Sequence, residues 1–380
     1  MENLPLHLAE EILFRLDRKS LARSKCVNRE LRSKISEPEF CIEYFCRSAP
    51  ACLIHSSGFG SNYVRYVSDN TKTEPEASGL PMRCQILGSG SGLVLLFLHQ
   101  LCVLNPITRK FRLLGEESSR FTQNILSIRG KRQMKIGFSV DNIDQTSQRF
   151  GVVSINEEEF MLHPDVSIYR FEIYDGDNDS WRVSETTIAC PASNLVERVK
   201  PVYFNRALHW LRRDGSIVAF NPEKDEARII PTTFPSLEST HLWLGAVEGN
   251  KTLTLISATE TLISVFILRD DPIPTWVLRK QINNDAIETG KWLFWTIVTY
   301  NERFLVVQET KEKGMSRLLH RYDAVAEEWS VLGDVPTWMD TDQDFFHFKA
   351  SWLDGAVRRS RPLRSLRQFM QMIGTHYEQI

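Results

Sequence analysis

Glycine-rich, histidine, cysteine and acidic residues could each support chemistry in this chain, and their spacing decides which chemistry remains open. The segment from Gly88 to Gly92 reads Gly-Ser-Gly-Ser-Gly, but no Lys-Ser or Lys-Thr pair follows it. A phosphate loop leads into a helix whose N-terminus holds the anion, whereas here an apolar strand pattern comes directly after. The nucleophile turn Gly-x-Ser-x-Gly would need serine at position 90, which is Gly90.

The remaining reactive residue types give no stronger pattern. The nine histidines include no His-Glu-x-x-His pair and the seven cysteines no Cys-x-x-Cys pair, which argues against a zinc site. Scattered cysteines in odd number predict reduced thiols in the nucleus or cytoplasm. Carboxylates are plentiful, so a carboxylate pair in a ring channel, as in some propeller hydrolases, stays open as an alternative. We expect no metal and no cofactor.

A different chemistry, apolar docking, is predicted at the N-terminus. Leu8, Ile12 and Leu16 recur at every fourth residue, Leu13 widens this stripe, and Pro5 suits the first turn of a helix. A second helix can follow from residue 17, where an aspartate supplies an N-cap. Three short helices bury little surface alone, so the stripe predicts a protein partner; the alternative is a hairpin that merely packs on the main domain.

Residues 4 to 40 resemble the F-box, the helical module by which substrate receptors bind the Skp-type adaptor of cullin-based ubiquitin ligases. Two positions depart from the family pattern: Asp17 stands where proline is usual, and Leu31 where tryptophan is usual. The resemblance implies an adaptor of the plant ASK family as direct partner and a cullin scaffold as indirect partner. The residues expected to bind the adaptor are Leu4, Pro5, Leu8, Ile12, Leu13, Leu16, Leu21 and Val27.

Net charge and hydropathy limit the classes of partner that the sequence predicts. The net charge is −2, from 46 basic and 48 acidic residues, which predicts no nucleic-acid partner. No apolar run approaches the roughly 18 residues that span a bilayer, so no membrane partner is expected. Acidic residues within the first eleven positions do not fit a secretory leader, and the predicted location is the nucleus, the cytoplasm or both.

After about residue 50 the pattern changes to short β-rich runs separated by Gly, Asn, Asp and Pro. A unit recurs in which an apolar strand ends at an Asp or Asn and a second strand begins a few residues later. The last four copies follow one another at intervals of about 50 residues, which is typical of propeller blades. The anchors of the copies are Asn105, Asp175, Asn221, Asp270 and Asp323.

The segments from Ile86, Lys135, Pro201 and Phe346 resemble the F-box-associated domain, a kelch-related, propeller-like domain that holds the protein to be ubiquitinated. Departures include Asn205-Arg206-Ala207, where the family has Asn-Gly-Ala. We therefore predict an α+β multidomain chain, with a three-helix F-box at 1–45 and an all-β propeller of about six blades at 50–357. A basic, amphipathic C-terminal helix is expected at 358–380, where a nuclear-import patch is one reading.

Four tryptophans lie outside the repeated hairpin positions. Because aromatic side chains often anchor protein interfaces, they are predicted to face the substrate; the alternative is packing within or between blades. They are Trp243, Trp292, Trp295 and Trp338. The whole pattern predicts a non-catalytic substrate receptor of a Skp-cullin-F-box ubiquitin ligase. The alternatives are an intracellular propeller hydrolase with a helical cap and an adaptor-binding scaffold acting outside a cullin ligase.

Overall fold

A computed structural model describes much of the chain between residues 6 and 348. Several of the predicted features lie outside the described residues: Trp292, Trp338, the Asp17 cap, the C-terminal helix, Leu4 and Pro5. The described residues are 6–16, 18–37, 40, 44, 52–57, 60–65, 85–97, 100–106, 110–115, 120–127, 132–143, 147–159, 165–197, 199–232, 241–246, 252–269, 274–285, 294–310, 316–336 and 345–348.

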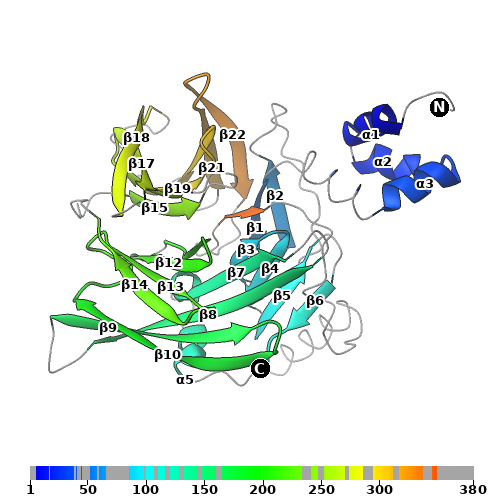
Figure 1. Ribbon diagram of the computed structural model, residues 1–380. Coiled ribbons are helices and arrows are strands. Elements are labelled where there is room, and N and C mark those ends of the chain that lie inside the picture. The colour runs from blue at the N-terminus through cyan, green and yellow to red at the C-terminus, as the bar shows by residue number, and fades with distance from the viewer. Residues whose placement is uncertain are drawn as a thin grey trace, which may run out of the picture.

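The described part of the N-terminal module contains the helices α1 (Leu6–Phe14), α2 (Arg18–Ser24) and α3 (Arg29–Ser36), and the apolar spacing predicts the first of them. They lie beside the β-domain (Figure 1). Asn28 caps α3, because its side-chain oxygen accepts a hydrogen bond from the backbone N–H of Leu31 at 2.7 Å. The apolar side chains buried among the helices are Leu13, Leu21, Ile35, Phe40 and Tyr44.

The rest of the described chain is mainly antiparallel sheet. Five sheets have four strands each, in chain order from one edge to the other. Two helices, α5 (Arg120–Ser127) and α6 (Arg132–Lys135), separate the first sheet from the second. The strands are β3 (Gln85–Gly90), β4 (Leu93–Phe97), β5 (Leu101–Asn105), β6 (Lys110–Leu113); β7 (Ile136–Asn142), β8 (Gln148–Glu159), β9 (Val166–Asp175), β10 (Ser180–Pro191); β11 (Val202–Phe204), β12 (Ala207–Leu211), β13 (Ile217–Asn221), β14 (Glu226–Ile230); β15 (His241–Ala246), β16 (Leu253–Ala258), β17 (Leu262–Arg269), β18 (Thr275–Asn283); β19 (Phe294–Tyr300), β20 (Phe304–Thr310), β21 (Ser316–Asp323) and β22 (Glu328–Pro336).

A sixth sheet joins the two ends of the β-domain. It contains β1 (Cys52–Ser57), β2 (Gly60–Arg65) and β23 (Phe346–Phe348), with β1 in the middle. Cys52 pairs with Phe348 and Ile54 with Phe346, so the last described strand completes a sheet with the first. In the sequence, the strand-like segments left over at the two ends of the β-region, Cys52 to His55 and Phe345 to Trp352, predict this closure. The described residues thus give five complete blades and a three-stranded sixth sheet, against a predicted count of about six.

The first strand of each four-stranded sheet, together with β23, forms the inner wall of the ring. β3 contacts β7, β7 contacts β11, and the series continues through β15, β19 and β23 back to β3. Glycine allows the close approach of two of these strands. A Cβ atom on Gly88 would lie 2.6 Å from the Cβ of Phe138 on β7. The glycine at position 88 therefore serves strand packing, which accounts for part of the Gly-Ser-Gly-Ser-Gly segment.

The anchors at positions 221 and 323 begin hairpin loops of one kind, whereas the Asp270 anchor lies outside the described residues. The Asp323 carboxylate accepts hydrogen bonds from the backbone N–H groups of Val325 and Ala326, at 2.9 and 3.3 Å. Asn221 does the same for Glu223 and Lys224, at 3.0 and 3.1 Å. These side chains replace backbone partners within the loop, which is why Asp and Asn suit the position. The predicted repeat therefore corresponds to a real structural unit.

The fourth residue after each of three anchors is an acid in the left-handed region of backbone space. These acids are Asp179, Asp225 and Glu327, with φ of 54°, 56° and 57°. Each pairs with a basic side chain on the last strand of the preceding sheet. The pairs are Arg112 with Asp179 at 3.1 Å, Arg182 with Asp225 at 3.4 Å, and Lys280 with Glu327 at 3.3 Å.

Candidate protein-docking sites

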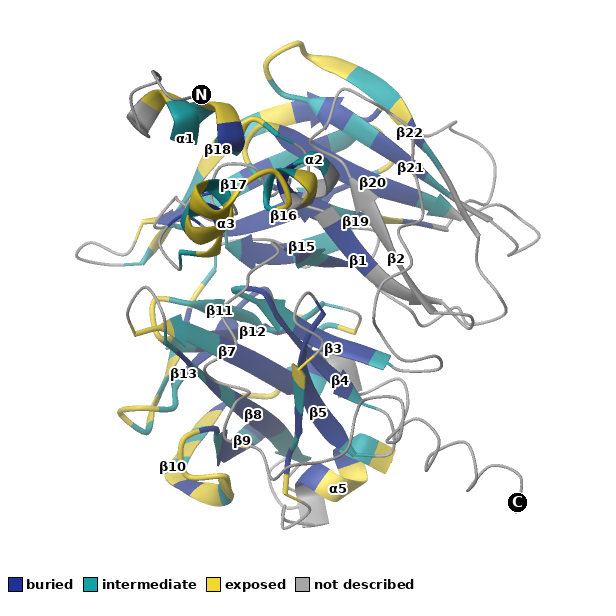
Figure 2. Cartoon of the chain, turned by 90° about the vertical axis from the view of Figure 1, so that its right-hand side faces the viewer, coloured by how far each residue is buried: buried dark blue, intermediate teal, exposed yellow. Residues whose placement is uncertain are grey.

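The predicted adaptor-binding residues divide into a surface set and a core set. Leu8, Ile12 and Val27 are 44%, 45% and 71% exposed, although all three are apolar. Leu13 and Leu21 are buried inside the helical module and help to hold it together. Figure 2 shows exposed positions along the three helices. The apolar stripe on α1 therefore has one half that supports the module and another half that is open to a partner.

Polar contacts fix the position of α1 against the rest of the module. Lys34 of α3 lies 2.9 Å from the Glu10 carboxylate of α1 and 2.6 Å from that of Glu37. These two acids hold the pKa of Lys34 above its usual value. The Tyr44 hydroxyl donates to the backbone carbonyl of Leu16 at 2.6 Å. These contacts fix the position of the helix on which the exposed half of the apolar stripe lies.

A stack of three aromatic rings fills the core of the module, which has Leu31 at the position where the family usually has a tryptophan. The ring of Phe40 lies parallel to those of Phe14 and Tyr44, with centroids 4.8 and 6.2 Å away. Leu31, which occupies the tryptophan position, is partly buried against the same cluster. The three rings give the small core large apolar groups at other positions, so the departure at Leu31 leaves a packed module.

The tryptophans predicted to face a substrate lie in different environments. Trp295 is 5% exposed, and its ring packs at a tilt against His241 with centroids 4.2 Å apart. Burial lowers the pKa of His241. Trp243 is half-buried and packs on the apolar cluster shared by the fourth and fifth sheets. Both rings pack at the boundary between these two blades, and a substrate-facing role for them stays a prediction.

The hairpin tryptophans have a separate role. The indole N–H of Trp181 on β10 donates to the carbonyl of Gly115, which follows the first sheet, at 2.9 Å. The indole N–H of Trp329 on β22 donates to the carbonyl of Asn283, at the end of the fourth sheet, at 3.1 Å. Each ring therefore ties its blade to the preceding blade.

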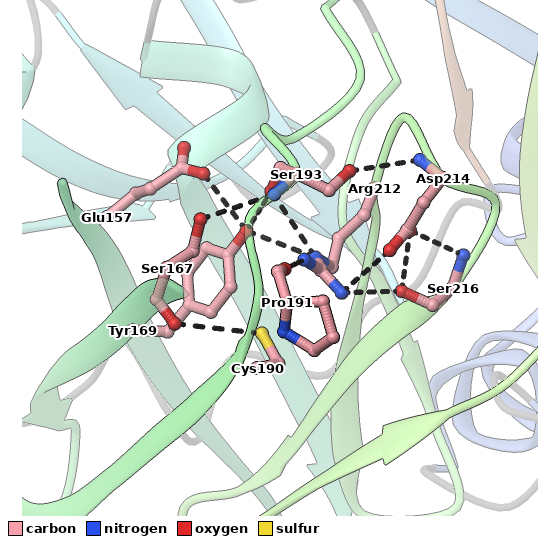
Figure 3. A network of polar contacts seen from close by, with 9 residues as sticks. All are labelled: Glu157, Ser167, Tyr169, Cys190, Pro191, Ser193, Arg212, Asp214 and Ser216. Carbon is pink, nitrogen blue, oxygen red and sulfur yellow. Dashed lines mark hydrogen bonds and ion pairs between the residues drawn. The ribbon is translucent and has the colours of Figure 1, made fainter. Parts of the chain in front are cut away.

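One network gathers side chains of catalytic types (Figure 3). The guanidinium of Arg212, which is 1% exposed, donates to the Tyr169 hydroxyl at 3.2 Å and to the Ser193 carbonyl at 3.3 Å. It also reaches the Pro191 carbonyl and Ser216 Oγ, the latter at 2.8 Å. These acceptors belong to the second and third sheets and to the segment that connects them, so the guanidinium donors of Arg212 are occupied within the fold.

The other reactive groups of this network are also protected. Cys190 is buried, and burial raises the pKa of its thiol, so the nucleophilic thiolate is disfavoured. Burial likewise raises the pKa of the Tyr169 hydroxyl, with a further contribution from Glu157. The arrangement suits a structural tie between two blades, not a site open to substrate.

Two further properties concern the part of the chain that the structure describes. No group of three or more His, Cys, Asp or Glu side chains there is placed to hold a metal ion. Within the same residues, no helix has the length and apolar character needed to cross a bilayer.

Comparison with known proteins identifies both parts of the chain. Residues 1–43 match the F-box domain model, and residues 67–316 match the model of the F-box associated beta propeller domain. The chain belongs to the F-box-associated β-propeller family. The relatives below are named as F-box proteins, in agreement with both matches.

The relatives are proteins of Arabidopsis thaliana. The F-box/kelch-repeat protein At1g20790 is 43% identical over 358 residues, which cover 93% of this chain and 78% of that protein. The F-box protein At1g20795 is 40% identical over 371 residues, with 94% and 87% coverage. The F-box protein At1g20360 is 40% identical over 311 residues, with 77% and 97% coverage. The similarity therefore extends through both the helical module and the propeller.

Proposed function

We propose that this chain is the substrate-recognition subunit of a Skp-cullin-F-box ubiquitin ligase. The observation that supports the proposal most directly is the open apolar half of α1, with Leu8 and Ile12 each nearly half exposed on a module of F-box type. An apolar pair in this position is stabilised when a partner covers it. The proposed direct partner is a Skp-type adaptor of the plant ASK family, which would connect the chain to a cullin.

In this function the chain itself performs no bond chemistry. The helical module binds the adaptor, the propeller binds a target protein, and a ubiquitin-conjugating enzyme elsewhere in the complex reaches the target's lysines. The rate enhancement then comes from proximity. The buried state of the Arg212 network agrees with a non-catalytic role. The proposed location is the nucleus, the cytoplasm or both, and the target is a protein.

The adaptor contact is tested by the double substitution Leu8→Ala with Ile12→Ala. Burying the exposed parts of both side chains contributes about 1.5 to 3 kcal/mol in total, so adaptor affinity should fall by about tenfold to a hundredfold. The measurement is titration of the purified full-length chain with a purified Skp-type adaptor.

The matched control is Ile143→Ala with Val325→Ala, which removes apolar atoms from two propeller residues that are 63% and 78% exposed. This variant should bind the adaptor like the wild type. Equal adaptor affinity of the Leu8/Ile12 variant and the wild type would show that α1 is not the docking helix.

A further inference from the structure

The charges of the helical module are unevenly distributed along its sequence. Residues 1–45 contain eight basic and eight acidic residues, so this part of the chain is balanced as a whole. Residues 18–37, which include α2 and α3, contain seven of the eight basic residues but two of the eight acidic ones, Glu30 and Glu37. These two helices therefore carry an excess of positive charge.

The acids of the module do not neutralise its exposed arginines. Glu10 and Glu37 both bind Lys34, at 2.9 and 2.6 Å. Among the described residues of the module, four arginines are exposed against one acid, Glu30. None of the four forms an ion pair with another described residue, so their charges stay open to solvent. They are Arg15, Arg23, Arg29 and Arg32.

Arg29 occupies a helix position that disfavours a basic side chain. It is the first residue of α3, directly after the Asn28 cap. The N-terminus of a helix carries a positive partial charge, so an acid is stabilising there and a base is not. Glu30 in the same turn follows this rule, whereas Arg29 contradicts it. The stability of α3 therefore does not explain the arginine at this position.

Unpaired arginines lie next to the exposed apolar side chains of the module in the sequence. Arg15 comes three residues after Ile12 and seven after Leu8, and its backbone N–H donates to the Ile12 carbonyl at 3.1 Å, which continues the last turn of α1. At this spacing the three residues share one side of the helix. Arg29 comes two residues after Val27, which is 71% exposed. A partner that covers these apolar groups therefore approaches positive charge.

We propose that the adaptor surface that receives the helical module is acidic, and that Arg15, Arg29 and Arg32 guide it toward the module by long-range attraction. This inference rests on the proposed function, because it assigns a chemistry to the adaptor's side of the contact. Unpaired arginines attract carboxylates, repel a basic surface and gain nothing from an uncharged one. Charges around an interface mainly set the association rate and its salt dependence, whereas most other interface contacts act on the dissociation rate.

The test follows association of the purified full-length chain with a purified Skp-type adaptor by stopped-flow fluorescence. The association rate constant of the wild type should fall by about tenfold or more between about 50 mM and about 500 mM salt, because salt screens the attraction. The dissociation rate constant should change by less than about twofold. Arg29→Gln with Arg32→Gln should slow association by about threefold to tenfold at the lower salt concentration and match the wild type at the higher one.

Two matched variants separate the charge of the arginines from any role in the fold. Arg29→Lys with Arg32→Lys keeps both positive charges and should associate as fast as the wild type. Arg269→Gln with Arg279→Gln removes the same charge from two exposed propeller residues that also form no ion pair with a described residue. This variant should associate with the adaptor at the rate of the wild type.

The inference is overturned if the association rate does not fall with salt, or if the glutamine variant of α3 associates as fast as the wild type at low salt. It is also overturned if the lysine variant is as slow as the glutamine variant, or if the propeller variant is equally slow. Adaptor binding without these charge effects contradicts only this inference. If the wild type binds no adaptor at any salt concentration, the proposed function is contradicted as well.

Discussion

At the scale of single residues, burial separates side chains that hold the fold from those that are free to bind. Arg212 illustrates the first kind, because its guanidinium satisfies two backbone carbonyls and two hydroxyl groups inside the protein. A buried charge of this kind is stabilising only while its partners remain. Arg213, the next residue, is 58% exposed and pairs only with Glu197 among the described contacts.

Arg212→Met should therefore destabilise the propeller by about 3 to 5 kcal/mol, because two carbonyls and the Tyr169 hydroxyl lose their donor. Arg213→Met should change stability by less than about 1 kcal/mol, since its pair is exposed. Denaturant unfolding of both variants measures the difference. Equal stability of the two variants would mean that the buried network does not support the fold.

A second residue-scale prediction concerns alkaline pH. Burial, together with the Glu302 carboxylate, raises the pKa of the Tyr300 hydroxyl to about 12. The unfolded chain loses this proton near pH 10, before the folded chain does, so folding stability is fully present below about pH 10 and falls as pH rises toward 12. Tyr300→Phe should show a shallower loss of Tm between about pH 9 and pH 11. A loss as steep as that of wild type would contradict the assignment.

The apolar spacing of the N-terminal stripe predicts α1 but not which leucines remain open. Leu13 and Leu8 look alike in the sequence, yet the first is buried and the second is 44% exposed. The difference arises because Phe40 and Tyr44 return to one side of the module after α3. The sequence likewise does not predict the burial of Trp295, because its ring packs against His241 of a different blade. Contacts between distant segments decide exposure, and periodicity does not report them.

At the scale of elements, the repeat recognised from its Asp and Asn anchors is the hairpin between the last two strands of a blade. The anchors could be predicted because the loop uses the side chain itself as an acceptor. The inter-blade pairs were not predicted, since Arg112 and Asp179 lie far apart in the sequence. The useful signal was an acid four residues after the anchor, at Asp179, Asp225 and Glu327.

Asp323→Ala should lower stability by about 1 to 2 kcal/mol, because two backbone N–H groups lose their acceptor. Asp323→Asn retains a side-chain oxygen and should behave much more like wild type. Thermal unfolding of the two variants separates the stability contributed by the hydrogen bonds from that contributed by the negative charge. If the asparagine variant is as unstable as the alanine variant, the loop depends on charge and not on the acceptor.

At the scale of the whole molecule, ring closure depends on a short strand from the C-terminal part of the chain. β23 pairs with β1 over only three residues, and Ser89 on β3 donates to the carbonyl of His347 at 2.5 Å. The leftover strand patterns at the two ends of the β-region predicted this closure. The sequence did not predict that the described part of the closing sheet has three strands, because strand order depends on long-range pairing.

Removing residues 345–380 deletes β23 and leaves the inner edge of β1 without its partner, so this variant should aggregate. Removing residues 356–380 retains β23 and should leave a monomeric propeller. Size-exclusion chromatography distinguishes the outcomes. A monomeric, cooperatively unfolding protein after the longer deletion would show that the ring does not need this closure.

The central claim is that one chain connects an adaptor to a target, and affinity purification from plant cells with mass spectrometry tests it most directly. The full-length chain should recover a Skp-type adaptor, a cullin and target proteins that accumulate when the proteasome is inhibited. The chain lacking residues 1–45 should lose the adaptor and the cullin while it keeps the targets. If the full-length chain recovers no adaptor, or if the shortened chain recovers adaptor and cullin equally well, the substrate-receptor function is contradicted.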